Sequence, residues 1–329
     1  LKKNYKVYGT FRRISSPNFW RLLSLGIANK VELIPADLID DSSLKEALRI
    51  SKPDEVYHLA AQSYVGASFS QPITSGEFTG LAVTRMLESI RQFDSTIKFY
   101  QASSSEMFGN NSSGKLDETS KFQPESPYAA AKVYGFNMTR MYREGYGMFA
   151  CNGILFNHES PLRGLEFVSR KVTNAVAKIS LGIDKFLYLG NLTSKRDWGY
   201  APEYVQCMWK MLQQKNPEDF VIASGKSYTV LDLVKKSFSL VDLDWKKHVK
   251  IDKKLYRILE VDKLEGDSKK AQKKLGWTPK TNFNELIKIM VESDIERWRQ
   301  WKNGKFFPWD AINSLDEYKT ITRHTTRKF

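Results

Sequence analysis

The chain has 329 residues, of which 41% are hydrophobic and 27% charged, and its formal net charge is +14. This length suits one two-part α/β enzyme with a sizeable core, and the absence of any run of about 18 apolar residues argues against a transmembrane helix and a membrane partner. Much of the positive charge lies in lysine pairs spread over the C-terminal third, so we expect a solvated basic surface and no nucleic-acid partner.

Short apolar runs typical of strands alternate with helix-like segments along the first third of the chain. The expected strands are residues 5–9, 31–36, 55–60 and 97–102, and the expected helices are residues 42–50 and 78–92. This alternation predicts crossover connections and therefore a doubly wound parallel sheet with helices on both faces. Ligands of such sheets bind beyond the carboxyl ends of the strands.

Tyr128 and Lys132 are spaced so that both side chains lie on one face of an expected helix. We expect the ammonium to lower the pKa of the phenol, so that Tyr128 can accept a proton from an alcohol that loses hydride. Ser104, at the end of a strand, is expected to hydrogen-bond the same alcohol oxygen. Glu106 is not needed for alcohol oxidation, but it can remove a proton next to a new ketone and protonate a leaving hydroxyl. The four residues predict a dehydratase.

Two cysteines occur, Cys151 in an expected apolar strand and Cys207 in an expected apolar helix. We interpret them as buried thiols of a protein from a reducing, cytoplasmic compartment. They lack metal-ligand spacing, so the sequence predicts no metal site.

Three stretches are more specific than the Tyr128/Lys132 pair: residues 98–109, 152–161 and 189–199. Through them the chain resembles the GDP-mannose 4,6-dehydratase family of the extended short-chain dehydrogenase/reductase superfamily, over roughly residues 1–298. The resemblance implies a Rossmann-type NADP-binding domain and a smaller nucleotide-sugar-binding domain. The first comprises residues 1–156 and about 187–222, the second residues 157–186 and about 223–298. Residues 299–329 form a basic, aromatic extension that either docks through its tryptophans or is a disordered tail.

The resemblance also implies NADP as the cofactor. Arg12, Arg13 and Ser15 follow an expected strand, where two guanidiniums and a hydroxyl suit a 2′-phosphate and an acidic residue would suit NAD. The other expected cofactor contacts lie at the adenine (Asp37, Leu38), at the pyrophosphate and ribose (Leu59, Ala60, Ala61, Gln62, Ser63) and near the nicotinamide (Lys132, His158, Arg163).

A GDP-sugar substrate follows from the same resemblance. Its expected contacts are Asn157, Lys171, Arg196, Arg257 and Glu260. The family usually has proline after the arginine at position 257 and a longer loop before it, so we expect a different substrate lid. Ser104 replaces the usual threonine and keeps its hydroxyl. Thr79 replaces a common aspartate, without a clear catalytic consequence.

A dinucleotide-binding unit begins with a strand and a glycine-rich turn, whose amides hold the pyrophosphate. The sequence opens at Leu1 without them. Either it is a fragment of its gene product, or the cofactor site is truncated in fact. We expect the fragment, with roughly 20 to 25 further residues upstream.

The expected reaction converts GDP-D-mannose to GDP-4-keto-6-deoxy-D-mannose by oxidation at C4, elimination of water across C5 and C6, and reduction at C6. Three alternatives stay open: a GDP-heptose 4,6-dehydratase, a nucleotide-sugar epimerase or reductase, and a non-catalytic nucleotide-sugar-binding homologue. A homo-oligomer, dimer or tetramer, is expected.

Overall fold

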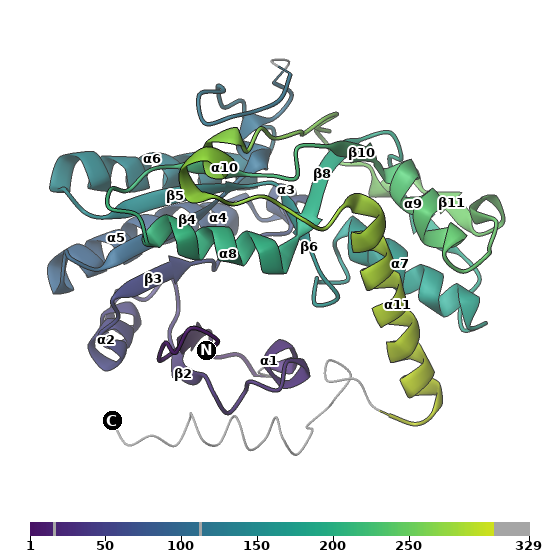
Figure 1. Cartoon of the computed structure of the whole chain (residues 1–329), viewed down its shortest axis with the longest axis horizontal. Helices are drawn as coiled ribbons and strands as arrows, with labels where there is room; N and C mark the ends of the chain where they lie inside the picture. Colours follow the sequence, from purple (N-terminus) through teal and green to yellow (C-terminus); the bar gives the residue numbers. More distant parts are fainter. Residues whose placement is uncertain (16–17, 112–113, 306–329) are drawn as a thin grey trace.

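The structure is a computed structural model that describes residues 1–15, 18–111 and 114–305. Figure 1 shows a larger body built on strands β3, β4 and β5 and a smaller body built on helices α7, α9 and α11. A three-stranded sheet joins them, in which β8 (Lys195–Tyr200) pairs with β6 (Asn157–Glu159) and with β10 (Ser227–Thr229).

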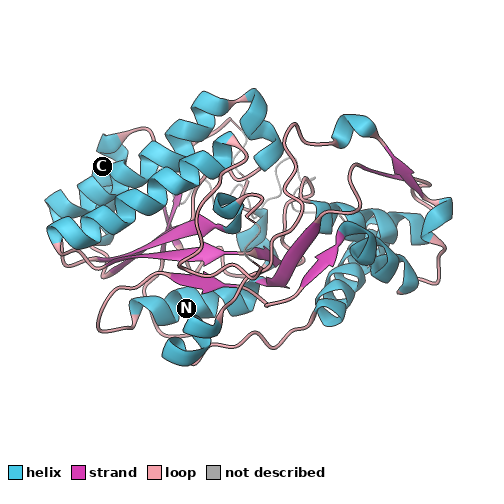
Figure 2. Cartoon of the chain, turned by 90° about the horizontal axis from the view of Figure 1, so that it is seen from above, coloured by secondary structure: helices cyan, strands magenta, loops and turns pink. Residues whose placement is uncertain are grey.

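A parallel sheet forms the centre of the larger body. Its order is β3 (Glu55–His58), β4 (Lys98–Ser104), β5 (Ala150–Leu155) and β9 (Phe220–Ile222). On one face, Phe99 and Ala150 pack against α5 (Ala82–Phe93) and α6 (Pro127–Tyr146). On the other, Tyr100 and Cys151 pack against α8 (Ala201–Leu212). Figure 2 shows helices on both sides of the strands, so the predicted doubly wound arrangement is confirmed.

The first two strands form a separate parallel pair, β1 (Tyr8–Phe11) with β2 (Glu32–Pro35). The first expected strand thus starts and ends later than predicted, because its pairing with β2 runs from Tyr8 to Phe11. Residues 1–4 form a turn, and the Tyr5 hydroxyl accepts from Trp209 Nε1. Within the described residues, no strand pairs with β1 opposite β2 or with β3 opposite β4. The further strand expected upstream stays a prediction.

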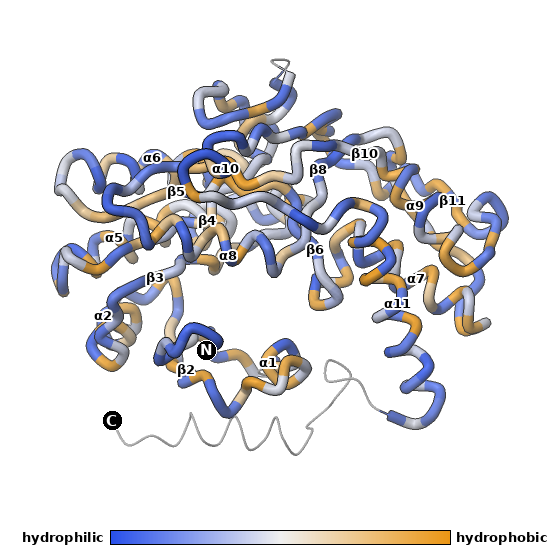
Figure 3. Tube along the Cα trace, viewed as in Figure 1, coloured by the Kyte–Doolittle hydropathy of each residue, from blue (hydrophilic) through white to orange (hydrophobic). Residues whose placement is uncertain are grey.

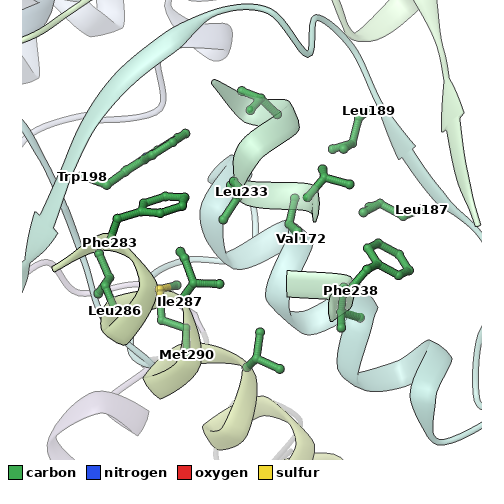
Figure 4. Packing of buried hydrophobic residues seen from close by; sticks show 14 of the residues in the cluster. Val172, Leu187, Leu189, Trp198, Leu233, Phe238, Phe283, Leu286, Ile287 and Met290 are labelled. Carbon is green, nitrogen blue, oxygen red and sulfur yellow. The ribbon is translucent and has the colours of Figure 1, made fainter. Parts of the chain in front are cut away.

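The smaller body has one apolar core, shown in Figure 4. Residues of α7 (Val168–Ser180), α9 (Val230–Ser239) and α11 (Phe283–Lys302) meet there with the parallel pair of β7 (Leu187–Leu189) and β11 (Val249–Ile251). Leu187 and Leu189 lie in this core. We expected the larger domain to resume near residue 187, and this domain boundary stays a prediction. Along α5 and α11, hydrophobic and hydrophilic stretches alternate in Figure 3, as they do in amphipathic helices.

The remaining elements are short, apart from α2. They are α1 (Trp20–Ser24), α2 (Asp41–Ser51), α3 (Val65–Ser70), α4 (Pro72–Ser75), the π-helix η1 (Gly76–Leu81), the 3-10 helices η2 (Ser105–Phe108), η3 (Trp245–Lys247) and η4 (Lys253–Leu255), and α10 (Lys269–Leu275).

The lysine pairs of the C-terminal third, the two cysteines and Trp298 lie among the described residues. The lysine pairs at 246–247, 253–254, 269–270 and 273–274 are exposed, apart from the half-buried Lys270. Cys151 and Cys207 are buried free thiols. None of the described helices has both the length and the apolar character needed to span a bilayer. Trp298 donates to Asn174 Oδ1 at 2.8 Å, so this tryptophan docks on α7, whereas Phe306, Phe307 and Trp309 lie outside the described residues.

A buried ion pair ties α7 to α11. The side chains of Arg170 and Asp294 are 1% and 0% exposed, and Thr173 Oγ1 donates to the same carboxylate at 2.7 Å. We expect Asp294→Ala to lower the free energy of unfolding by about 3–5 kcal/mol, because the Arg170 charge would stay buried without its counter-ion. Glu292→Ala, in an exposed pair with Lys288 on the same helix, should change it little. Urea unfolding of both variants measures this, and equal effects would contradict the expectation.

Candidate active site

An open cleft of about 840 Å³ lies at the carboxyl ends of β4 and β5, where the parallel sheet predicts a ligand site. The larger body contributes to its lining Ser104, Glu106, Tyr128 and Lys132. The opposite wall includes the five expected substrate contacts, Asn157, Lys171, Arg196, Arg257 and Glu260. The structure therefore brings all the predicted catalytic and substrate residues to one cleft.

Helix α6 presents Tyr128 and Lys132. Ser126 caps the helix, since its side chain accepts a hydrogen bond from Ala129 N at 3.1 Å, and Pro127 begins it. The helix start is thereby fixed directly before Tyr128, and Lys132 follows one turn later. Lys132 Nζ lies 5.7 Å from the centroid of the Tyr128 ring and donates to Ala102 O at 2.6 Å. The predicted shared face is confirmed.

The pKa of Tyr128 departs from the expected direction. Burial raises the pKa of Tyr128 to about 12, although a hydrogen bond with Ser104 lowers it in part. The ammonium lies over the face of the ring and bonds to the Ala102 carbonyl. Desolvation of the phenolate therefore outweighs the neighbouring positive charge.

Burial also lowers the pKa of Lys132 from 10.5 to about 8. Below about pH 8 the folded protein carries this ammonium at a cost in stability. Between about pH 8 and 10.5 the unfolded chain binds more protons at this site, so the cost falls as pH rises. Relative to Lys132→Met, the unsubstituted protein should gain about 2 kcal/mol of unfolding free energy between about pH 7 and 9.5. Urea unfolding at both pH values tests this; a difference that does not change with pH would count against it.

Glu106 lies in η2, which follows β4 directly. Ser104 caps this short helix, because its Oγ accepts from Glu106 N at 3.2 Å. The Glu106 carboxylate lies 3.5 Å from Arg257 Nη1 and 3.9 Å from the Nε of the buried Arg196. Burial lowers the pKa of Arg196, and the Glu106 charge opposes this effect. Two of the expected substrate cations therefore flank the expected catalytic carboxylate. Glu260 accepts from Arg257 N at 3.0 Å.

His158 and Arg163 lie where the second wall meets the cleft. His158 Nδ1 is 2.9 Å from Phe156 O, and its ring stacks on Tyr204. Burial lowers the pKa of His158, which favours the neutral ring at neutral pH. Arg163 Nε lies 3.3 Å from the Glu159 carboxylate, and its guanidinium lies over the Phe167 ring at 3.6 Å.

Three arginines that were not predicted from the sequence donate hydrogen bonds to the backbone of the loop that carries Arg163. Three consecutive backbone carbonyls each accept from a different guanidinium: Pro161 O from Arg297 at 3.2 Å, Leu162 O from Arg21 at 3.0 Å and Arg163 O from Arg170 at 2.9 Å. The three donors come from α11, α1 and α7. No local motif links such distant segments, so this arrangement had no sequence signal.

The expected cofactor residues fall into two groups. Leu59, Ala61 and Ser63 line the cleft, and Ala60 and Gln62 belong to the same loop. Arg12, Arg13 and Ser15 follow β1 and are exposed, and Asp37 and Leu38 follow β2 and are half-buried. These last five residues follow the predicted strand ends but do not line the cleft. Leu38 packs against the core of the larger body.

The chemistry of these groups fits a nicotinamide dinucleotide. Neither Arg12 nor Arg13 forms an ion pair with a carboxylate among the described residues, and Lys132 offers a buried ammonium. Within the same part of the chain, Gln62 Oε1 is buried without a hydrogen-bond partner. Such cations and a free amide suit phosphates and ribose hydroxyls.

Comparison with known proteins identifies the family. Residues 1–290 match the family described as GDP-mannose 4,6 dehydratase. GDP-mannose 4,6 dehydratase 1 of Arabidopsis thaliana is 47% identical over 306 residues, which cover 90% of this chain and 84% of the relative. The chain belongs to the GDP-mannose 4,6-dehydratase family. The resemblance expected from the motifs is therefore confirmed.

Solved structures of other proteins share the fold of this chain. The dTDP-glucose 4,6-dehydratase of Bacillus anthracis str. Ames, in complex with NAD, has a TM-score of 0.78 at 18% identity and covers 92% of each chain. RMD of Pseudomonas aeruginosa, complexed with NADPH, has a TM-score of 0.74 at 18% identity, over 88% of this chain and 99% of that one. The Rossmann-type α/β fold predicted for this member of the GDP-mannose 4,6-dehydratase family is confirmed.

Proposed function

We propose that the protein is a GDP-mannose 4,6-dehydratase that uses NADP and forms GDP-4-keto-6-deoxy-D-mannose. The observation that carries this proposal is Glu106, which shares one cleft with Ser104, Tyr128 and Lys132 and is flanked by two arginines. A carboxylate at this place serves elimination, which alcohol oxidation alone does not require. Family membership supports the same activity.

Each proposed catalytic residue either transfers a proton or binds a group of the substrate or cofactor. Although burial raises the pKa of Tyr128 to about 12, the reacting form is the phenolate, which takes the proton of the 4-hydroxyl. Ser104 hydrogen-bonds the same oxygen. Hydride transfer from C4, and later to C6, is the chemistry that NADP would supply when bound. Glu106 removes the C5 proton next to the new 4-ketone and protonates the 6-hydroxyl, which leaves as water. When hydride reaches C6, C5 takes up a proton, which balances the one that Tyr128 accepted from the 4-hydroxyl. Lys132 holds the nicotinamide ribose. One water is lost in total, and the oxidation state of the cofactor is restored.

The second wall suits a nucleoside diphosphate sugar. Lys171, Arg196 and Arg257 supply cations for the diphosphate, and Asn157 and Glu260 supply polar groups for the rest of the ligand. A GDP-heptose differs by one carbon at C6, so it remains the nearest alternative. Comparing kcat/KM for GDP-mannose and the GDP-heptose separates the two. Formation of the 4-epimer or net consumption of NADPH would favour an epimerase or reductase, and binding without turnover would favour a non-catalytic homologue.

The cofactor is proposed to be NADP in preference to NAD. Arg12 and Arg13 gain charge-assisted hydrogen bonds of about 1.5–3 kcal/mol each only when a 2′-phosphate is present. The double variant Arg12→Ala/Arg13→Ala should therefore lose affinity for NADP and keep its affinity for NAD. Equilibrium titration with both nucleotides measures this. Arg49→Ala, which removes an exposed arginine paired with Glu46, controls for overall charge. An unchanged preference in the double variant would refute the proposal.

The proposal includes the oligomeric state and the compartment of the protein. We expect a homo-oligomer, dimer or tetramer, which sedimentation of the purified protein tests. The buried free thiols Cys151 and Cys207 support a reducing, cytoplasmic compartment. Within the described residues no group of His, Cys, Asp and Glu could hold a metal ion.

A further inference from the structure

The π-helix η1 (Gly76–Leu81) lies between α4 and α5 and packs against α6. Gly80 makes the closest approach: a Cβ at this position would lie 3.4 Å from the backbone oxygen of Ala131, the residue before Lys132. Wide helical turns of this kind often occur at functional sites, although the turn alone does not define one. Here two neighbouring side chains of the turn reach two separate segments of the proposed cofactor site.

Thr79 reaches the loop of residues 59–63. Its side chain is buried, its Oγ1 accepts from Gln62 N at 3.2 Å, and it lies 3.4 Å from Gln62 O as a donor. Both backbone groups of Gln62 are thereby tied to η1. The neighbouring residue, Phe78, reaches Arg12 after β1, whose guanidinium carbon lies 5.5 Å from the centroid of the Phe78 ring.

An aromatic ring can order Arg12 without competing with a phosphate. The positive charge interacts with the face of the ring, whereas the N–H donors lie in the plane of the guanidinium and stay available. A carboxylate partner would instead have to be displaced by the incoming anion. Among the described residues no carboxylate pairs with Arg12, and the cation–π contact with Phe78 is available to order this exposed side chain. Ordering before binding reduces the entropy lost when the phosphate binds.

We propose that Phe78 is a positioning residue for cofactor specificity, which holds Arg12 where it meets the 2′-phosphate of NADP. Thr79, by contrast, positions the loop of residues 59–63, which serves NADP and NAD alike. The inference rests on the NADP site described under the proposed function.

Affinities for NADP and NAD, measured by equilibrium titration of the purified protein, test this without relying on turnover. Phe78→Leu should weaken NADP about two- to five-fold and leave NAD unchanged. Thr79→Val should weaken both nucleotides to the same extent. Phe78→Tyr keeps the ring and should keep the preference, which separates the cation–π contact from a general packing loss.

Arg12→Met, alone and combined with Phe78→Leu, separates the role of Phe78 from the role of Arg12 in the proposed NADP site. If Phe78 acts through Arg12, the double variant should bind NADP as Arg12→Met does. Additive losses, or equal losses for NADP and NAD in Phe78→Leu, would overturn the role of Phe78 and leave the NADP site intact. If Arg12→Met itself leaves the preference unchanged, the role of Arg12 in the cofactor site fails, and the inference fails with it.

Discussion

Replacing Glu106 with glutamine should stop elimination while C4 oxidation continues. The amide keeps the shape of the side chain but cannot take the C5 proton, whereas Tyr128, Ser104 and Lys132 are unchanged. Formation of the 6-deoxy product should fall by about 10²- to 10⁴-fold. Reduced nicotinamide should accumulate on the enzyme, which its absorbance after mixing with GDP-mannose would show.

A matched carboxylate outside the cleft controls for the loss of charge. Glu218 pairs with Lys270 and Lys274 at the surface, so Glu218→Gln should leave product formation unchanged. The role of Glu106 is wrong if Glu106→Gln forms product at the normal rate. It is equally wrong if the variant forms no reduced nicotinamide, because the first step would then depend on the carboxylate.

Tyr128→Phe should block the reaction one step earlier. The substitution keeps the buried ring and removes the phenolic oxygen that, as the phenolate, accepts the proton of the 4-hydroxyl. We expect both the transient reduced nicotinamide and the product to fall by about 10²- to 10⁴-fold, because the first hydride transfer lacks its base. Rapid-mixing absorbance and product analysis measure the two stages separately.

The same helix supplies the control. Tyr134 is 41% exposed, and its hydroxyl lies 3.0 Å from Thr84 Oγ1, so Tyr134→Phe should retain activity. Accumulation of reduced nicotinamide in Tyr128→Phe would mean that another group accepts the first proton. Tyr128→Phe and Glu106→Gln would then not block oxidation and elimination separately, as the proposed roles require.

Local patterns in the sequence were sufficient to predict much of the fold and to select four proposed catalytic residues that share one cleft. The alternation of strands and helices predicted the doubly wound sheet, and the spacing of Tyr128 and Lys132 predicted their shared helix face. Both depend on neighbours along the chain. The start of β1 was misplaced because it is set by pairing with β2, which begins at Tyr8 and which local hydropathy does not report.

Contacts between segments that are distant along the chain could not be predicted from the sequence. The ion pairs of Glu106 with Arg196 and Arg257 form only when the two walls of the cleft meet, and the three arginines behind the Arg163 loop come from three different helices. The pKa of Tyr128 was predicted in the wrong direction because it depends mainly on burial of the phenol by tertiary packing. Spacing along a helix does not determine that burial.

The central claim, an internal redox cycle around one cleft, is tested most directly by following the hydrogen at C4. GDP-mannose labelled with deuterium at C4 should give GDP-4-keto-6-deoxy-mannose with the label at C6, because the hydride removed in the first step returns in the last. Mass spectrometry and NMR of the product locate the label. Deuterium found on released nicotinamide, or retained at C4 in a 4-epimer, would contradict the proposed dehydratase.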